Sequence, residues 1–207
     1  MSEPRWAEIT TAAGRLRVAL SRCVYEPSDD SLLAIEAMVK LKEMGRTYEA
    51  VLDLGTGSGV LALASSLLFR PRRLAAVDIS PYAVECARAT LGPDAAVIQC
   101  NGAKCLNNRW DLVILNPPYL PSSEVPRDEC DFWEFLAWSE GTNHERLCRD
   151  AAEVGNEVLI VRSSLSSFNV DSCLRDEGLH MDGVLASRRF FMEELRVELW
   201  NRFSVKK

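Results

Sequence analysis

The sequence predicts an α/β fold in which helices cover both faces of a mostly parallel β-sheet. From Val51 onward, short apolar runs alternate with segments of helical periodicity, which is the pattern that such a sheet produces. A glycine cluster follows the first apolar run, at the point where a strand is expected to give way to a helix. The chain has 207 residues, of which 47% are hydrophobic and 26% charged, so it can bury one sizeable core.

The segment before the first strand of this sheet predicts a short N-terminal extension. Polar and apolar residues alternate over Arg15–Val18, which favours a strand or a hairpin. Ser28 or Asp29 then caps a helix in which apolar residues recur at i, i+3 and i+7. We therefore expect residues 1–45 to pack, as an extension with the first helix, on a main domain formed by residues 46–207.

The main domain contains seven strand-like segments. They are Val51–Leu54, Leu74–Val77, Ala95–Gln99, Asp111–Leu115, Val158–Val161, Val184–Ala186 and Leu195–Trp200. Helices are expected at Val60–Leu68 and from Pro81, which suits a first helical turn, to about Leu91. Polar and apolar residues alternate in the last strand, so we expect it to run antiparallel with one face in water.

The charge of the chain argues against a protein built to neutralise nucleic-acid phosphates. Lys and Arg number 24 and Asp and Glu number 30, which gives a formal net charge of −6. No apolar run approaches the roughly 20 residues that span a bilayer, and the N-terminus is too polar for a secretory signal. The sequence therefore predicts a cytoplasmic protein without membrane association.

The cysteines and histidines predict no metal site. Seven cysteines are scattered without a C-x-x-C pair, and the two histidines, His144 and His180, lie far apart in the sequence. We expect most of the cysteines to be reduced and to act as small apolar residues of the core.

A candidate ligand site lies in Asp53–Gly59, directly after the first strand. The spacing is G-x-G-x-G with an acidic residue two places earlier, and Val60 stands where the dinucleotide fingerprint needs its third glycine. Asp53 would suit a cationic group such as an ammonium. Asp78, at the end of the second strand, could accept hydrogen bonds from two ribose hydroxyls. The alternative is a tight turn with a capping aspartate.

A second candidate site is Asn116-Pro117-Pro118-Tyr119, directly after the fourth strand. The Asn116 side-chain oxygen and the Pro117 main-chain carbonyl could hold both hydrogens of an –NH2 group. Tyr119 could stack on a planar amide or base. Holding such a weakly nucleophilic nitrogen in line with a methyl group would accelerate transfer through positioning. The alternative is a strand terminator, because Asn-Pro and Pro-Pro both mark turns.

Together these motifs resemble the S-adenosylmethionine-dependent amino-methyltransferases, and among them the small HemK-like protein-glutamine methyltransferases of archaea and eukaryotes. The similarity lies in Asp53–Gly59, Asn116–Tyr119, Val24–Ser31 and Ala137–Asn143. It implies a seven-stranded, Rossmann-like class I methyltransferase fold, mostly parallel, with an antiparallel last strand. It also implies methyl transfer to the side-chain amide nitrogen of the glutamine in the Gly-Gly-Gln motif of a class I release factor.

The resemblance implies a role for each matching residue. The catalytic residues would be Asn116, Pro117, Pro118 and Tyr119, and the cofactor-binding residues would be Ser31, Asp53, Gly55, Gly57, Asp78, Ile79, Asn101, Gly102 and Asn116. Asp53 would bind the methionine moiety and Asp78 the ribose. Asn101 stands where the family has an aspartate that contacts the adenine amino group, so the charge of that contact is lost.

The resemblance also implies a small zinc-binding activator subunit, which adds a strand to an edge of the sheet. Ala95–Cys100 carries no charge and falls at an edge of the expected fold, so it is the expected place for such a subunit. The alternative is that a neighbouring helix covers this strand.

Other functions could use the Asn116–Tyr119 site. A nucleic-acid amino-methyltransferase would act on adenine N6 or guanine N2, and a protein lysine methyltransferase would use much the same pocket edge. The net charge of −6 and the acidic side chains between residues 124 and 131 disfavour nucleic acid as the main partner. The loss of the acid at Asn101 favours a third alternative, an inactive scaffold.

The aromatic stretch Phe132–Trp138 is expected either to form an edge of the substrate site or to be a cluster that holds a long loop in place.

Overall fold

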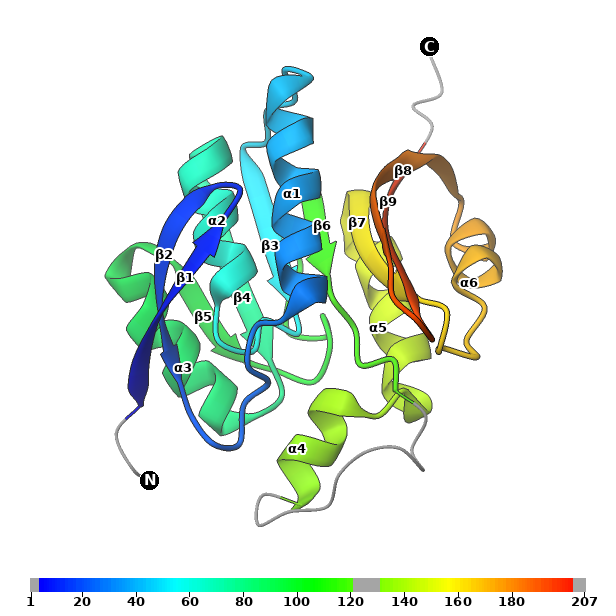
Figure 1. Ribbon diagram of the computed structural model, residues 1–207. Coiled ribbons are helices and arrows are strands. Elements are labelled where there is room, and N and C mark those ends of the chain that lie inside the picture. The colour runs from blue at the N-terminus through cyan, green and yellow to red at the C-terminus, as the bar shows by residue number, and fades with distance from the viewer. Residues whose placement is uncertain (1–3, 121–130, 203–207) are drawn as a thin grey trace.

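A seven-stranded sheet forms the centre of the structure, a computed structural model that describes residues 4–120 and 131–202 (Figure 1). Its strands are β3 (Ala50–Leu54), β4 (Arg73–Asp78), β5 (Ala96–Gln99), β6 (Trp110–Leu115), β7 (Gly155–Ser163), β8 (Leu179–Arg189) and β9 (Glu194–Arg202). Their spatial order is β5-β4-β3-β6-β7-β9-β8, and β9 pairs antiparallel with both of its neighbours. The predicted sheet with an antiparallel last strand is confirmed.

Helices cover both faces of this sheet, as the sequence predicts. They are α1 (Asp29–Glu43), α2 (Val60–Phe69), α3 (Pro81–Leu91), α4 (Asp131–Trp138), α5 (Gly141–Val154) and α6 (Val170–Asp176), with a 3-10 turn at Gly92–Asp94. All five residues of β3 are buried. Val51 and Leu112 belong to a core that includes α1 and α2, whereas Leu52 and Val113 belong to a core that includes α5 and α6. The period-2 alternation of strand side chains thus separates two apolar layers.

The N-terminal segment forms a hairpin followed by a helix. β1 (Arg5–Thr11) and β2 (Gly14–Leu20) pair antiparallel, and the Ala19 N–H donates to Thr90 Oγ1 of α3 at 2.9 Å. Side chains of β2 and α1 share one buried cluster with the main sheet. The expected hairpin and helix are confirmed, while the domain boundary at residue 45 stays a prediction.

The aromatic stretch after β6 forms helix α4, and both interpretations of this stretch stay predictions. Apolar side chains recur at helical spacing in this stretch, and Trp138 at its end packs edge-on against Tyr25 with ring centroids 4.9 Å apart. Phe132 at the start of the helix is largely exposed. The acidic residues Glu124, Asp128 and Glu129 lie outside the described residues.

Five of the cysteines form two groups. Cys86, Cys148 and Cys173 are free and buried, as expected. Cys100 and Cys105 form a disulfide, so the expectation of reduced cysteines is wrong for this pair. The turn between them brings their Cα atoms to 6.2 Å, which is within the range that a disulfide can bridge.

The strand order places a crevice at the carboxyl ends of β3 and β6. The chain runs from β3 outward through β4 to β5, and then returns to the other side of β3 to form β6. Such a reversal of strand order separates the loops that follow the two central strands, and ligands of open α/β sheets bind there. Both candidate sites of the sequence follow these two strands.

Candidate active site

The glycine turn after β3 borders an open pocket. Gly55 and Gly57 have φ angles of 79° and 55°, in the left-handed region that favours glycine. A Cβ atom at either position would meet no atom within 4 Å. The turn is held by β4, because the N–H groups of Gly55 and Thr56 both donate to the Val77 carbonyl, at 2.8 and 2.9 Å. A bound molecule could therefore approach this backbone closely.

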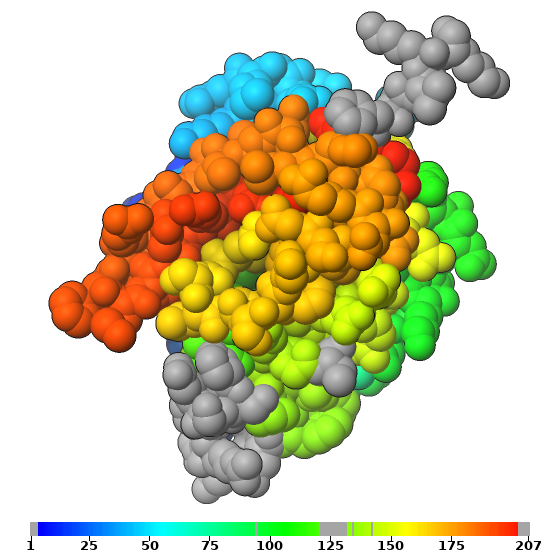
Figure 2. All heavy atoms as spheres, turned by 90° about the vertical axis from the view of Figure 1, so that its right-hand side faces the viewer, coloured from blue at the N-terminus to red at the C-terminus, as the bar shows by residue number. Residues whose placement is uncertain are grey.

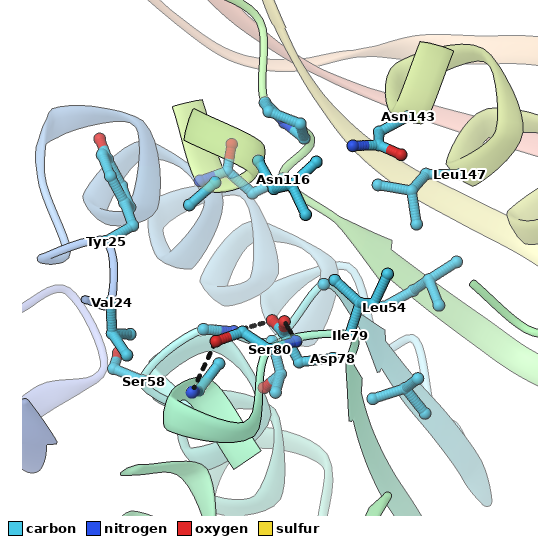
Figure 3. Close-up of a pocket in the computed structure, with 18 of the residues that line it drawn as sticks. Val24, Tyr25, Leu54, Ser58, Asp78, Ile79, Ser80, Asn116, Asn143 and Leu147 are labelled. Carbon is cyan, nitrogen blue, oxygen red and sulfur yellow. Dashed lines mark hydrogen bonds between the residues drawn. The ribbon is translucent and has the colours of Figure 1, made fainter. Parts of the chain in front are cut away.

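Asp78 ends β4 beside the turn and ties it to the start of α3. Its Oδ2 accepts from the Gly57 N–H and its Oδ1 accepts from the Ser80 N–H, each at 2.9 Å. Burial raises the pKa of Asp78, and backbone N–H groups partly oppose that effect. Figure 3 shows Asp78 and Ser80 on one side of the pocket and Asn116 on the other. Each Asp78 oxygen keeps acceptor capacity for a hydroxyl group.

Asp53 does not line the pocket, which corrects the expectation that its carboxylate meets a ligand. The side chain is 1% exposed, and its Oδ2 accepts from Thr56 Oγ1 at 2.7 Å and from the Ala62 N–H at 2.9 Å. The free N–H groups at the start of α2 attract this carboxylate away from the pocket. Burial raises the pKa of Asp53 to about 6. Asp53 therefore braces the glycine turn against α2.

The other residues predicted to bind the cofactor lie around the same pocket. They are Ser31, Gly55, Gly57, Asp78, Ile79, Asn101, Gly102 and Asn116. Asn101 is exposed at the rim, whereas Gly102 is buried beside α5. A Cβ at Gly102 would collide with the Asp150 carboxylate, which accepts from the Ala103 N–H at 2.8 Å. The loop after β5 is thereby fixed against α5.

Asn116 is oriented by Asp30, a residue of α1 to which the sequence assigned no role. Asn116 Nδ2 donates to Asp30 Oδ2 at 3.0 Å. Asn116 Oδ1 is buried and has no hydrogen-bond partner among the described residues. A buried carbonyl oxygen without a partner is unfavourable by about 1–3 kcal/mol. The amide of Asn116 is therefore held with its acceptor free for an incoming donor.

Two tyrosine hydroxyls converge on the same carboxylate. Tyr25 donates to Asp30 Oδ1 at 3.1 Å and Tyr119 donates to Asp30 Oδ2 at 3.3 Å. Asp30 is 3% exposed. Burial and the neighbouring Asp30 charge raise the pKa of both tyrosines, so the two hydroxyls stay protonated and act as donors at neutral pH.

The Asn-Pro-Pro-Tyr corner lies between the pocket and a second depression. Asn116 and Pro118 line both of them. Pro117 and Tyr119 line the second depression but not the pocket, whereas Tyr25 and Ala137 of α4 line both. A group that enters through this second depression thus reaches Asn116 from the side opposite the glycine turn.

Helix α5 supplies pocket residues that the sequence did not identify. Asn143, Arg146 and Leu147 line the pocket and fall at i, i+3 and i+4 on one face of the helix. Figure 3 shows Asn143 and Leu147 at the pocket. Helical periodicity alone would have assigned that face to the core. The sequence feature that could have identified these residues is the motif at Ala137–Asn143, because its last residue, Asn143, is the first pocket residue of this helix face.

No metal centre is found in the parts of the chain that the structure describes. Within residues 4–120 and 131–202, no three His, Cys, Asp or Glu side chains are close enough together to hold a metal ion. In the same ranges, no helix combines the length and the apolar character needed to cross a bilayer.

The pocket fits the nucleoside cofactor that the resemblance implies. Its glycine turn leaves room against bare backbone, and the Asp78 carboxylate can accept from ribose hydroxyls. Apolar walls from Leu54, Val77 and Ile79 can hold a planar base and a thioether chain. Asn116 then stands at the far side, where the methyl group of S-adenosylmethionine would be delivered.

Comparison with known proteins gives the same family. Residues 31–134 match the family model "Methyltransferase small domain". A candidate protein N5-glutamine methyltransferase of Methanocaldococcus jannaschii is 31% identical over 161 residues, which cover 73% of this chain and 78% of the relative. The release factor glutamine methyltransferase of Bradyrhizobium diazoefficiens is 33% identical over 180 residues, or 79% of this chain, which spans only 61% of that relative.

Solved structures share the fold at lower identity. The Thermus thermophilus 16S rRNA N2 G1207 methyltransferase, solved with S-adenosylmethionine and guanosine, has a TM-score of 0.72 at 16% identity, over 98% of this chain and 52% of that one. The Mtq2-Trm112 complex of E. cuniculi, responsible for methylation of the termination factor eRF1, has a TM-score of 0.67 at 20% identity, over 87% and 99%.

Three observations therefore indicate the same family: the fold, the pocket at the carboxyl ends of β3 and β4, and the sequence match. The sheet is that of class I methyltransferases, and the matched region contains both the glycine turn and the Asn-Pro-Pro-Tyr corner. The chain belongs to the methyltransferase small domain family and, within it, to the HemK-like protein N5-glutamine methyltransferases, enzymes that use S-adenosylmethionine.

Proposed function

We propose that this protein is a cytoplasmic enzyme that methylates the side-chain amide nitrogen of the glutamine in the Gly-Gly-Gln motif of a class I release factor. The name of the Bradyrhizobium diazoefficiens relative supports this substrate. The observation that carries the proposal is the free acceptor at Asn116 Oδ1, beside a pocket suited to S-adenosylmethionine.

The corner recognises an amide because it offers acceptors for both hydrogens of an –NH2 group. Asn116 Oδ1 accepts one hydrogen, and the Pro117 carbonyl accepts the other. Asp30 prevents the Asn116 amide from flipping, since Asn116 Nδ2 already donates to it. With its nitrogen presented to Asn116, a glutamine amide would satisfy a carbonyl oxygen that otherwise stays buried without a partner.

Positioning supplies most of the rate in this proposal. An amide nitrogen is a weak nucleophile because its lone pair is delocalised. Bound S-adenosylmethionine supplies an electrophilic methyl group, and the corner holds the amide nitrogen facing it. Fixing two reactants in this way replaces a bimolecular encounter and can supply several kcal/mol of the barrier. Tyr119 packs at the mouth of the corner and limits the orientations of the entering side chain.

The direct test is methylation of a purified release factor, followed by mass spectrometry of its Gly-Gly-Gln peptide. We expect a gain of one methyl group on the glutamine with the wild-type protein. Asn116→Ala should abolish turnover while the dissociation constant for S-adenosylmethionine stays within about tenfold, or roughly 1.4 kcal/mol. Asn108→Ala, a matched change at an exposed asparagine, should leave turnover unchanged.

The same assay separates the alternative substrates. Methyl incorporation only into RNA or DNA would replace the proposal by a nucleic-acid amino-methyltransferase. Incorporation at a lysine of the release factor would indicate a protein lysine methyltransferase. Near-normal turnover by the Asn116 variant would remove the role assigned to this side chain.

A small zinc-binding activator subunit at the β5 edge is the second part of the proposal. β5 is an edge strand with exposed side chains at Ala96 and Gln99. The N–H of Cys100 donates to Asp78 of β4, so by strand alternation the N–H of Val97 faces away from the sheet. The E. cuniculi neighbour was solved as the Mtq2-Trm112 complex, which supports a partner subunit.

A proline at the outward-facing position tests the activator site. Val97→Pro removes an N–H that the sheet does not use, so the fold should survive, since edge strands tolerate proline there. We expect the variant to lose co-purification with a co-expressed activator subunit. If co-purification persists unchanged, the subunit binds elsewhere.

A further inference from the structure

The turn between β8 and β9 exposes an unusual group of large apolar side chains. Phe191 is 99% exposed, Met192 77% and Phe190 36%. Figure 2 shows this turn, in orange and red, projecting from the body of the molecule. Three consecutive exposed apolar residues are rare on a soluble protein unless they contact a partner.

The base of this turn is firmly held, so its apolar side chains occupy a defined place. The Phe190 N–H donates to the Glu193 carbonyl at 2.7 Å. Ser163 Oγ donates to the Glu193 carboxylate at 2.6 Å, and the Glu194 N–H donates to Ser164 Oγ at 2.9 Å. The last two bonds anchor the turn to the end of β7.

The depression beside the turn is continuous with the one that opens at Asn116. Phe190, Phe191 and Met192 line it together with Tyr119 and Glu193. Tyr119 and Glu193 also line the depression that contains the Asn-Pro-Pro-Tyr corner. A chain segment lying along this surface would thus contact the apolar turn while one of its side chains enters the corner.

The charge of the depression selects the kind of partner. Asp30 and Glu193 both line it. The Glu193 carboxylate accepts from the Ser163 hydroxyl and pairs with no Lys or Arg of the described residues. Asp29 at the rim is neutralised by Arg188 at 2.9 Å. A negative surface next to apolar side chains repels a phosphate backbone and attracts a polypeptide with apolar and neutral or basic residues.

We propose that Phe191 and Met192 form a docking site for the polypeptide substrate, on residues outside the glutamine-bearing tripeptide. The inference rests on the proposed function, which it deepens by assigning recognition of the folded substrate to the β8–β9 turn. Apolar anchors of this kind dominate the affinity of protein interfaces. The turn raises the affinity for the whole substrate and takes no part in the chemistry at Asn116.

The test compares an intact substrate with a minimal one. The double variant Phe191→Ser/Met192→Ser would be assayed with a whole class I release factor and with a short peptide that contains only the Gly-Gly-Gln motif and its immediate neighbours. We expect KM for the whole protein to rise at least tenfold with kcat unchanged, and both constants for the peptide to stay the same. Met44→Ser is the control, since Met44 is 61% exposed beyond the opposite end of α1.

Each other outcome overturns the inference. Unchanged kinetics with the whole protein would remove the docking role while leaving the proposed function intact. An equal loss of kcat/KM with the whole protein and with the peptide would place the turn inside the reaction site. A change from dimer to monomer in gel filtration would make a second copy of this chain the occupant. If the wild-type protein methylates neither substrate, the proposed function fails, and the docking site fails with it.

Discussion

Asn116 Nδ2 lies 3.0 Å from Asp30 Oδ2, and this hydrogen bond joins the loop after β6 to the first turn of α1. It fixes which end of the Asn116 amide is free. Tyr25 and Tyr119 donate to the same carboxylate, so Asp30 is the common acceptor of the groups around the corner. We assign Asp30 as a positioning residue for the proposed reaction.

Asp30→Asn should therefore lower kcat at least tenfold. An amide at this position can donate to Asn116, which allows the Asn116 amide to flip and to present a donor to the substrate. The dissociation constant for S-adenosylmethionine should change less than threefold, because Asp30 does not line the pocket. Asp29→Asn is the matched control, since Asp29 is half-exposed and pairs with Arg188. Equal effects of the two variants on kcat would contradict the assignment.

The two aspartates at the ends of β3 and β4 should differ in their effect on cofactor binding. Asp53→Asn keeps an oxygen that can accept from Thr56 and Ala62, so titration calorimetry should find the affinity for S-adenosylmethionine reduced less than threefold. Asp78→Asn places an amide N–H against the donor of Gly57 or Ser80 and would weaken the ribose contact that we propose for Asp78. We expect at least a tenfold loss. The reverse order would restore the direct role first expected of Asp53.

The elements of the fold could be predicted because their signals are local. The short apolar run at Val51–Leu54 is typical of a strand buried on both faces, and the segment after Pro81 is typical of a helix. Both elements occur where the sequence places them. The glycine turn and the Asn-Pro-Pro-Tyr corner were predictable for a similar reason. Each follows a buried strand, and parallel strands end at the same side of a sheet.

The contacts within the site were not predictable, because they depend on packing between distant segments. Asp29 and Asp30 are adjacent and equally acidic, yet one is half-exposed and the other 3% exposed. Asp30 is the acceptor only because α1 packs over the end of β6, 86 positions along the chain. For Asp53, by contrast, the contacts that decide its position are local. The donors of Thr56 and Ala62 hold its carboxylate out of the pocket.

Asp53 should also make stability fall as pH rises. Burial raises its folded-state pKa to about 6, above its ordinary value of 3.8. The folded state therefore keeps a proton that the unfolded state has lost, and the free energy of unfolding decreases between pH 4 and pH 6. The full decrease in the free energy of unfolding that Asp53 causes is about 3 kcal/mol. Denaturant titrations at pH 4 and pH 7 should show that, relative to the wild type, Asp53→Asn gains free energy of unfolding at pH 7 over pH 4. Parallel curves would contradict the pKa of Asp53.

His144 should act in the opposite direction over the same interval. Its side chain is 1% exposed, its ring lies 4.7 Å from that of Phe168, and neither ring nitrogen has a hydrogen-bond partner among the described residues. Burial lowers the pKa of His144 from 6.5 to about 4. As pH falls, the unfolded state gains a proton before the folded state does. The contribution of the neutral ring to the free energy of unfolding is therefore complete above pH 6.5 and is lost as pH falls toward 4. This loss amounts to about 3 kcal/mol.

Replacing His144 by leucine should therefore raise stability at pH 5 more than at pH 7. The leucine fills the apolar site beside Phe168 without burying two unpaired nitrogens, so the variant should be no less stable than the wild type at pH 7. His180→Leu, a change at an exposed position, is the control. Asp53 and His144 shift stability in opposite directions between pH 4 and pH 6, so their contributions partly offset each other in the wild type. The free energy of unfolding of His144→Leu should therefore fall more steeply between pH 4 and pH 6 than that of the wild type, and an unchanged slope would contradict the lowered pKa of His144.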